Sequence, residues 1–242
     1  MLPASQRKNV QYKNGRRRRL PDVPGLRIER EWWDQGAVVA GIDEVGRGAW
    51  AGPVTYAALV LPSDKRMYKL RDSKMLDPQR REELATRLRG FALDIGIGEA
   101  SNAEIDAVGM TEAIRRAARR AVDALTVRPD VCLIDGNWDF LAGYGTTNVR
   151  VVGGDAHSAS IAAASIVAKV HRDGNMTQQC PSYPAYRFSS NKGYPSPEHK
   201  ASLRAHGPCD LHRASWAPIR ALSQGLLWDE DAEPPEMTMA QP

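Results

Sequence analysis

The sequence has little cysteine, no long apolar run and no apolar segment near its first residue. Its three cysteines, Cys132, Cys180 and Cys209, are far apart and odd in number, so they form no closed disulfide framework. This pattern favours a reducing compartment. No stretch approaches the roughly 20 apolar residues that cross a bilayer, and the start of the chain lacks the apolar core of a secretory signal. These absences predict a soluble, cytoplasmic protein.

Charge is concentrated at the two ends of the chain. Residues 1–20 hold seven Lys or Arg and no acid, and residues 229–242 hold five acids and no base. Subtracting them from 33 basic and 29 acidic residues leaves 26 and 24, so the body is nearly neutral. We expect a basic, flexible tail over 1–30, one folded domain over 31–228 and an acidic, disordered tail over 229–242. The RRRR run in the first tail could attract phosphates non-specifically, or be simply solvated.

The folded part predicts an α/β chain with a mixed central sheet flanked by helices and a helical C-terminal segment. Short β-branched segments bounded by Gly or Pro predict strands, the first two of them antiparallel, at 37–43, 53–61, 91–100, 130–136 and 147–154. Helical spacing and capping patterns predict helices at 77–89, with Asp77 as the N-cap, at 101–125, with a capping box of Ser101 and Glu104, at 157–173, from about 197, and near 217–228.

Four acids stand at the ends of these expected elements: Asp43 and Glu44, Asp135 and Asp173. Strand ends of an α/β sheet face the crevice in which such folds bind ligands. An acid at the C-terminal end of a helix, where Asp173 is expected, opposes the helix dipole. If the fold gathers the four, their repulsion needs a hard cation, Mg²⁺ or Mn²⁺, because no His/Cys cluster favours zinc. Two such ions about 4 Å apart cut phosphodiesters.

Each of these acids taken singly could equally be a helix cap or a surface charge. Adjacent Asp43 and Glu44 would point to opposite faces of a regular strand. We therefore expect the strand to end or bulge there if both residues bind metal.

Six sequence blocks, in order, resemble the signature of bacterial ribonuclease HII. They are GIDEVGRGAWAGPV (41–54), DSK (72–74), LIDGN (133–137), IAAASIVAKVHRD (161–173), NKGYPSPEH (191–199) and HGPCDLHRASW (206–216). The resemblance covers roughly residues 37 to 220. It implies a ribonuclease H-like fold and a catalytic domain over 31–228. It also implies cleavage of RNA strands in RNA–DNA hybrids and of single ribonucleotides in duplex DNA, leaving 3′-hydroxyl and 5′-phosphate ends, with a role in DNA repair.

Carried over residue by residue, the resemblance makes Asp43, Glu44, Asp135 and Asp173 the metal ligands. Gly46, Arg47 and Gly48 match the family segment that approaches the 2′-hydroxyl, the group that separates RNA from DNA. Tyr194 matches the tyrosine that packs on the sugar beside the cut, and Lys74 and Lys192 match phosphate contacts. Gly46 and Gly48 could instead serve only a tight turn, and Tyr194 could be an ordinary half-buried ring.

The sequence departs from the family pattern at two positions. Many relatives carry lysine where this chain has Gly153, and lysine is also common where it has His157. These changes put substrate affinity in doubt more than chemistry. His206, Cys209 and His212 are spaced like zinc ligands but have no fourth partner nearby, so we expect no metal there.

Two features concern partners. QGLLW (224–228) loosely resembles the peptides by which bacterial replication proteins dock on the sliding clamp, although packing of the last helix on the body is the favoured alternative. We expect a monomer, since reading one junction needs one active site.

The rival functions are a related ribonuclease H with another junction preference, a DNA-directed nuclease on the same fold, and a non-catalytic hybrid-binding module.

Overall fold

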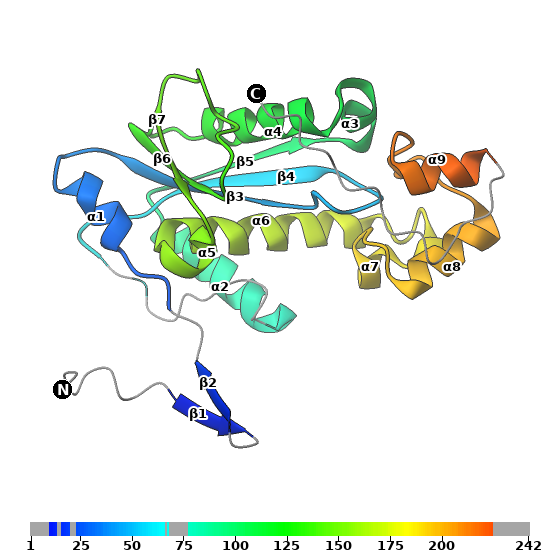
Figure 1. Ribbon diagram of the computed structural model, residues 1–242, viewed down its shortest axis with the longest axis horizontal. Helices are drawn as coiled ribbons and strands as arrows, with labels where there is room; N and C mark the ends of the chain where they lie inside the picture. The colour runs from blue at the N-terminus through cyan, green and yellow to red at the C-terminus, as the bar shows by residue number, and fades with distance from the viewer. Residues whose placement is uncertain (1–9, 14–15, 20–22, 66, 68–76, 225–242) are drawn as a thin grey trace.

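The computed structural model describes residues 10–13, 16–19, 23–65, 67 and 77–224 (Figure 1). Lys74, residues 225–228 of the clamp-like peptide and the acidic tail over 229–242 lie outside the described residues. None of the helices in the described ranges is long and apolar enough to cross a membrane.

A five-stranded mixed sheet forms the centre of the molecule, as expected. Its strands, in spatial order, are β5 (Asp94–Ala100), β4 (Val54–Val60), β3 (Val39–Val45), β6 (Val131–Asp135) and β7 (Thr147–Val151). β5, β4 and β3 are antiparallel neighbours, whereas β3, β6 and β7 run parallel. The predicted antiparallel pairing of the first two sheet strands is confirmed. Separately, β1 (Val10–Lys13) and β2 (Arg16–Arg19) form an antiparallel hairpin.

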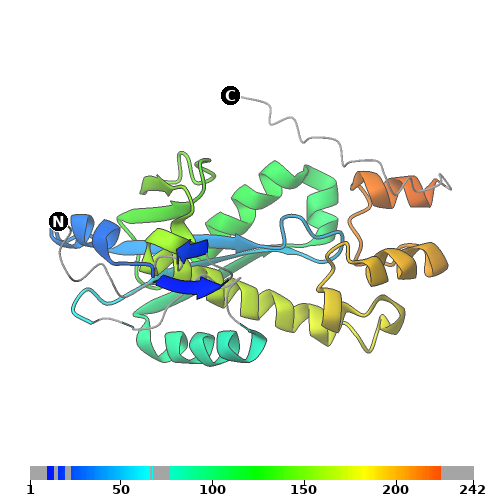
Figure 2. The same cartoon turned by 60° about the horizontal axis from the view of Figure 1, so that its bottom comes forward.

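Helices cover both faces of the sheet (Figure 1). One face carries α4 (Met110–Asp123) beside α3 (Asn102–Val108), and the other carries α6 (Ala159–Gln178), with α2 (Pro78–Phe91) packed beyond it. α1 (Arg27–Trp33) contacts β3, and α5 (Gly154–His157) leads into α6. The C-terminal elements gather at one end of the molecule (Figure 2): η3 (Pro184–Tyr186), α7 (Phe188–Asn191), α8 (Pro197–His206) and α9 (Ala217–Ser223).

Close packing of α6 on β3 depends on Gly41. A Cβ at this position would lie 2.1 Å from the backbone carbon of Ser160, so only glycine allows the strand and helix to approach this closely. The contact brings the apolar length of α6 onto the same sheet face as Asp43. The C-terminal elements have a small core of their own, in which Phe188, Leu203 and Ile219 pack with Trp50 and Met176.

Two expected helices differ from the structure. The helix predicted over 101–125 is broken into α3 and α4 at Gly109, whose φ of +79° ends α3, although Ser101 caps α3 as predicted. The helix predicted to end at Asp173 continues to Gln178. Asp173 is therefore inside the helix, where an ion pair with Lys169 one turn earlier supports it. The helix-dipole argument for Asp173 was wrong.

The folded body begins before residue 31. The carboxylate of Glu29 is fully buried and accepts hydrogen bonds from the Ser158 hydroxyl at 2.6 Å and the Ser160 N–H at 2.8 Å. The Gly25 N–H also donates to the His157 carbonyl. Residues 25–30, which were expected to belong to the tail, thus pack on the start of α6.

Candidate active site

A hollow of about 270 Å³ lies where β3 and β6 end. It is lined by residues from the sheet, from the segment that follows β3, from α6 and from the segment after α7: Asp43, Glu44, Val45, Gly46, Arg47, Gly48, Asp135, Ser165, Lys169 and Tyr194. Seven of the residues proposed from the sequence therefore share one hollow. Asp173 and Lys192 are not among the residues that line it.

The parallel pairing of β3 and β6 places two carboxylates together. Ile42 pairs with Ile134, so Asp43 and Asp135 each stand one position further along their strands, at the same edge of the sheet. β3 runs on regularly to Val45, with Glu44 opposite Tyr56 of β4. The end or bulge that was expected between Asp43 and Glu44 if both bind metal is therefore absent from β3. Both residues line the hollow, which lies at the carboxyl ends of β3 and β6.

Asp43 is crowded by negative charge. Its side chain is 5% exposed, and burial raises its pKa well above the ordinary value, with further increases from Glu44 and Asp135. Hydrogen bonds from Ser165 and from the Glu44 N–H, at 2.7 Å, act in the opposite direction but do not cancel the increase. The protein thus holds this carboxylate in a place where its charge is only partly compensated.

A buried acid that was not predicted from the sequence directly follows a hydrogen-bond donor of Asp135. The Oδ1 of Asp135 accepts a 2.6 Å hydrogen bond from the N–H of Gly154, and the next residue, Asp155, is only 7% exposed. The sequence held a signal for it, because Asp155 follows an expected strand and two glycines, as Asp43 and Asp135 close theirs. Lys169 and Ser165 were also missed, since nothing in the pattern of α6 marks which of its residues reach the hollow.

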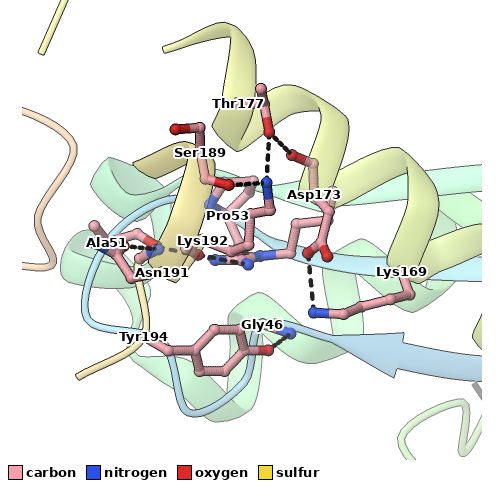
Figure 3. A network of polar contacts seen from close by, with 12 residues as sticks. Gly46, Ala51, Pro53, Lys169, Asp173, Thr177, Ser189, Asn191, Lys192 and Tyr194 are labelled. Carbon is pink, nitrogen blue, oxygen red and sulfur yellow. Dashed lines mark hydrogen bonds and ion pairs between the residues drawn. The ribbon is translucent and has the colours of Figure 1, made fainter. Parts of the chain in front are cut away.

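Asp173 pairs with a cation instead of lining the hollow. Its Oδ1 lies 3.0 Å from the Nζ of Lys169, one helical turn earlier (Figure 3). Lys169 itself lines the hollow and lies 5.4 Å from the centre of the Tyr194 ring. Asp173 thus shares a partner with the site without belonging to its lining.

The segment Gly46-Arg47-Gly48 is held by a buried arginine. Arg213, fully buried, donates to the carbonyls of Gly46 at 2.6 Å, Arg47 at 2.9 Å and Gly52 at 3.1 Å. A second buried arginine, Arg172, donates to the carbonyls of three neighbouring residues at 2.8 to 3.0 Å, namely Pro53, Lys192 and Ala51. The two side chains fix the shape of the loop through its backbone.

The two glycines of this segment have different reasons to be glycine. Gly46 has a φ of +88°, and a Cβ there would lie 2.2 Å from the Nε of Arg172, so the fold itself requires glycine. Gly48 is exposed, and a Cβ there would meet nothing within 4 Å. The tight-turn alternative accounts for Gly46 but gives no reason for Gly48.

Tyr194 lines the same hollow as the carboxylates. Its hydroxyl accepts a 3.1 Å hydrogen bond from the N–H of Gly46 (Figure 3). Its ring lies 5.3 Å from the guanidinium of Arg172. Lys192 points elsewhere: its Nζ donates to the Thr177 hydroxyl and the Ser189 carbonyl, both at 2.6 Å. The structure therefore joins Tyr194 to the Gly-Arg-Gly segment and leaves Lys192 outside.

The donor set of the hollow suits a hard divalent cation. Its acids supply oxygen only, and the partly compensated charge around Asp43 is what such a cation would neutralise. Among the described residues, no three His, Cys, Asp or Glu side chains already converge closely enough to hold an ion. Binding would therefore draw these carboxylates together.

A buried histidine pair lies behind Tyr194. His199 is fully buried, His212 is 3% exposed, and their Nε2 atoms are 3.0 Å apart. Burial, and then repulsion from His199, lowers the pKa of His212 to about 4, and burial also lowers the pKa of His199. The folded protein thus keeps both rings neutral at neutral pH.

This pair predicts a loss of stability in mild acid. Below its ordinary pKa of about 6.5 the unfolded chain protonates His212, while the folded protein does not until about pH 4. Stability from His212 is thus complete above pH 6.5 and falls as the pH drops towards 4, by about 3 kcal/mol. Thermal unfolding of wild type and His212→Gln between pH 7.5 and 4.5 measures the difference. His206→Gln, which removes an exposed histidine, is the control, and parallel profiles for wild type and His212→Gln would contradict the prediction.

Comparison with known proteins identifies the family. The family model for ribonuclease HII matches residues 40–219. A ribonuclease HII of Streptomyces avermitilis is 48% identical over 188 residues, which cover 77% of this chain and 80% of that protein. The crystal structure of the ribonuclease H2 from Pyrococcus horikoshii superposes with a TM-score of 0.67 at 28% identity, covering 77% of this chain and 97% of that one.

A second archaeal structure, of the PCNA:RNase HII complex from Archaeoglobus fulgidus, matches with a TM-score of 0.63 at 25% identity. It covers 74% of this chain and 95% of that one. The fold predicted from the sequence, a ribonuclease H-like α/β fold, is thus confirmed. The chain belongs to the ribonuclease HII family, and it is accordingly a metal-dependent endoribonuclease that acts on the RNA strand of RNA–DNA hybrids.

Proposed function

We propose that the chain nicks duplex DNA on the 5′ side of single embedded ribonucleotides, leaving 3′-hydroxyl and 5′-phosphate ends. The observation that carries this proposal is that one hollow joins two kinds of residue. Asp43, Glu44 and Asp135 line it together with the Gly46–Gly48 segment and the Tyr194 ring. A nuclease that cut DNA without regard to the sugar would have no use for the second group. A binding module would have no use for the first.

The carboxylates would hold two divalent ions, Mg²⁺ or Mn²⁺. When bound, such ions supply an activated water and stabilise the leaving oxygen of the cut phosphodiester. Asp43, Glu44 and Asp135 are the ligands that line the hollow, and we propose Asp155 as the fourth in place of Asp173. Asp155 is buried beside the partner of Asp135, whereas Asp173 is paired with Lys169. Lys169, which lines the hollow as Arg47 does, is then a cation that can contact a substrate phosphate.

The sugar would be read by the backbone at Gly48. A Cβ at Gly48 would project into open space, so the fold does not require glycine there. Its lack of a side chain would instead leave room for a ligand. The 2′-hydroxyl can both donate and accept hydrogen bonds, so the exposed backbone at Gly48 can recognise it. The Tyr194 ring, fixed to the N–H of Gly46, would pack against the neighbouring sugar.

Partners beyond the duplex stay predictions. The Archaeoglobus ribonuclease HII was solved in complex with PCNA, so contact of residues 224–228 with a sliding clamp fits this family, but only Gln224 of them is described. Deleting 224–242 should then abolish clamp pull-down and leave nicking of free duplex unchanged. A monomer in the cytoplasm remains our proposed state.

One labelled duplex tests the proposed function. It carries a single ribonucleotide, its all-DNA twin is the control, and each is incubated with Mg²⁺, Mn²⁺ or EDTA. We expect metal-dependent nicking 5′ of the ribonucleotide and no cut in the twin. Cleavage of a continuous hybrid without a nick at the single ribonucleotide would remove the sugar-reading role of Gly48 and Tyr194. Cleavage of the all-DNA twin would favour the DNA-directed nuclease, and binding without turnover would favour the non-catalytic module.

The substitution Gly48→Ala tests whether Gly48 serves recognition of the sugar or stability of the fold. Since the added methyl group meets nothing within 4 Å, we expect an unchanged melting temperature. It would stand where the sugar approaches, so kcat/KM on the single-ribonucleotide duplex should fall on the order of 10-fold or more, about 1.4 kcal/mol. Gly90→Ala, at an exposed position of α2 where a Cβ would also meet nothing within 4 Å, is the matched control and should leave activity unchanged. Equal activity of the two variants would contradict the reading role of Gly48.

A further inference from the structure

We infer that His199 and His212 are positioning residues for Tyr194, acting through a directed chain of hydrogen bonds that ends on the Tyr194 carbonyl. The chain starts at the N–H of Cys209, 2.9 Å from the Nδ1 of His212. It continues through the two Nε2 atoms, 3.0 Å apart, and ends with the Nδ1 of His199, 2.8 Å from the Tyr194 carbonyl oxygen. This role rests on the proposed function, in which Tyr194 contacts the sugar.

The two ends of the chain dictate where both protons lie. The N–H of Cys209 can only donate, so the Nδ1 of His212 accepts and the proton of that ring is on Nε2. The Tyr194 carbonyl can only accept, so the Nδ1 of His199 carries the proton and its Nε2 accepts. The 3.0 Å contact then has one donor, His212, and one acceptor, His199. The two ends of the chain thus agree on one placement of the protons: His212 is protonated on Nε2 and His199 on Nδ1, so the two rings are different tautomers.

No other placement of the protons keeps both end bonds and the bond between the rings; the Cys209 carbonyl, 3.2 Å from the His212 Nδ1, accepts instead from the His212 backbone N–H at 2.9 Å. His199 lies against Tyr186 and Phe188, with ring centres 6.4 and 5.6 Å away, and His212 lies against the same two rings at 4.9 and 5.9 Å. The other polar contacts of the His212 Nδ1 are the Sγ and carbonyl of Cys209, both at 3.2 Å. Adding a proton to either ring would set two donors against each other across the 3.0 Å contact.

The hydrogen-bond chain ends on Tyr194, the residue whose ring contacts the sugar in the proposed function. The Tyr194 carbonyl also accepts from the Ser196 N–H at 2.8 Å, so the backbone of Tyr194 is held from α8 while its hydroxyl is held by Gly46. The ring therefore spans between the histidine pair and the Gly-Arg-Gly segment. Loss of the His199 donor would free the backbone end of this span and leave the hydroxyl end in place.

Two substitutions at His199 distinguish positioning from mere packing. His199→Asn puts an amide near the place of Nδ1, where it can still donate to the Tyr194 carbonyl. His199→Gln puts an amide near the place of Nε2, where it can accept from His212 but no longer reaches that carbonyl. We expect Gln to lower kcat/KM on the single-ribonucleotide duplex about 10-fold, the scale on which partners that orient functional groups act, and Asn to restore most of it. Melting temperatures report any general damage, and equal losses for variants of equal stability would overturn the inference.

Two further measurements close the test. In a Tyr194→Ala background the difference between Asn and Gln should vanish, and a difference that persisted would show that His199 does not act through Tyr194. Nitrogen-15 NMR of the full chain at neutral pH should find the proton of His199 on Nδ1 and that of His212 on Nε2, and equal tautomers would overturn the chain. If wild type fails to nick the single ribonucleotide, the proposed function is wrong. The Asn–Gln contrast is then decided on a continuous RNA–DNA hybrid.

Discussion

Asp43→Asn is expected to abolish cleavage while leaving the fold intact and duplex binding largely unchanged. Asparagine keeps the shape of the side chain but removes one charge from the three carboxylates that line the hollow. A site that holds divalent ions through oxygen ligands loses affinity with each charge removed. We expect turnover to fall by at least about 10²–10³-fold, the scale of losing one charge-stabilising group in an active site.

The same variant should be more stable than wild type when metal is absent. The Asp43 carboxylate is buried and repelled by Glu44 and Asp135, which raises its pKa and shows that its charge is disfavoured. A neutral amide relieves this repulsion near neutral pH, and each kcal/mol gained raises the melting temperature by about 2–4 °C in a chain of this size. Lost activity with gained stability would separate a functional charge from a structural one.

Nicking assays and thermal unfolding in EDTA measure both effects. Asp34→Asn, which removes an exposed carboxylate just after α1, is the matched control and should change neither. A variant of Asp43 that cut at the wild-type rate would refute the assignment of the hollow as the active site.

Asp155→Asn is expected to reduce turnover about as strongly as Asp43→Asn, and Asp173→Asn much less. Asp155 is buried next to Gly154, whose N–H binds Asp135, so it can join the carboxylates with a small movement. Asp173 holds Lys169 instead, at 3.0 Å. Its loss would free that lysine and change the affinity for duplex rather than the chemical step.

Mn²⁺ titration of the metal-free proteins, followed by single-turnover cleavage, distinguishes the two acids. We expect Asp155→Asn to weaken metal binding and slow the chemical step, and Asp173→Asn to shift mainly the KM for duplex. The reverse result would return Asp173 to the metal site and remove Asp155 from it. Circular dichroism of both variants controls for folding.

Much of the fold could be predicted from the sequence because its signals are local. The strands around Asp43 and Asp135 are short, apolar and bounded by glycine, and the caps at Ser101 and Asp77 both form as expected. The ends of helices were harder. Gly109 broke a helix whose apolar spacing looked continuous, whereas α6 ran past Asp173 and through Gly174, although glycine often marks the end of a helix.

The candidate site could be predicted only in part, because it depends on contacts between distant segments. Asp43, Glu44 and Asp135 follow from strand ends, whereas the neighbourhood of Asp155 depends on how β7 turns into α5 against β6. Arg172 and Arg213 gave no sequence signal, since a buried arginine bound to backbone carbonyls looks like any surface arginine until the fold is known. The same is true of the His199–His212 pair.

The two buried arginines have a consequence for how this loop can change during evolution. All six hydrogen bonds that Arg172 and Arg213 donate to these segments go to carbonyl oxygens, although the guanidinium of Arg172 also lies 5.3 Å from the centre of the Tyr194 ring. Every residue type carries a carbonyl, so most side chains in these segments can be exchanged without loosening the loop. The backbone shape of the Gly46–Gly48 segment can therefore be conserved independently of the side chains it carries. Related enzymes can change the side chains that contact the substrate while the backbone that presents them keeps its shape.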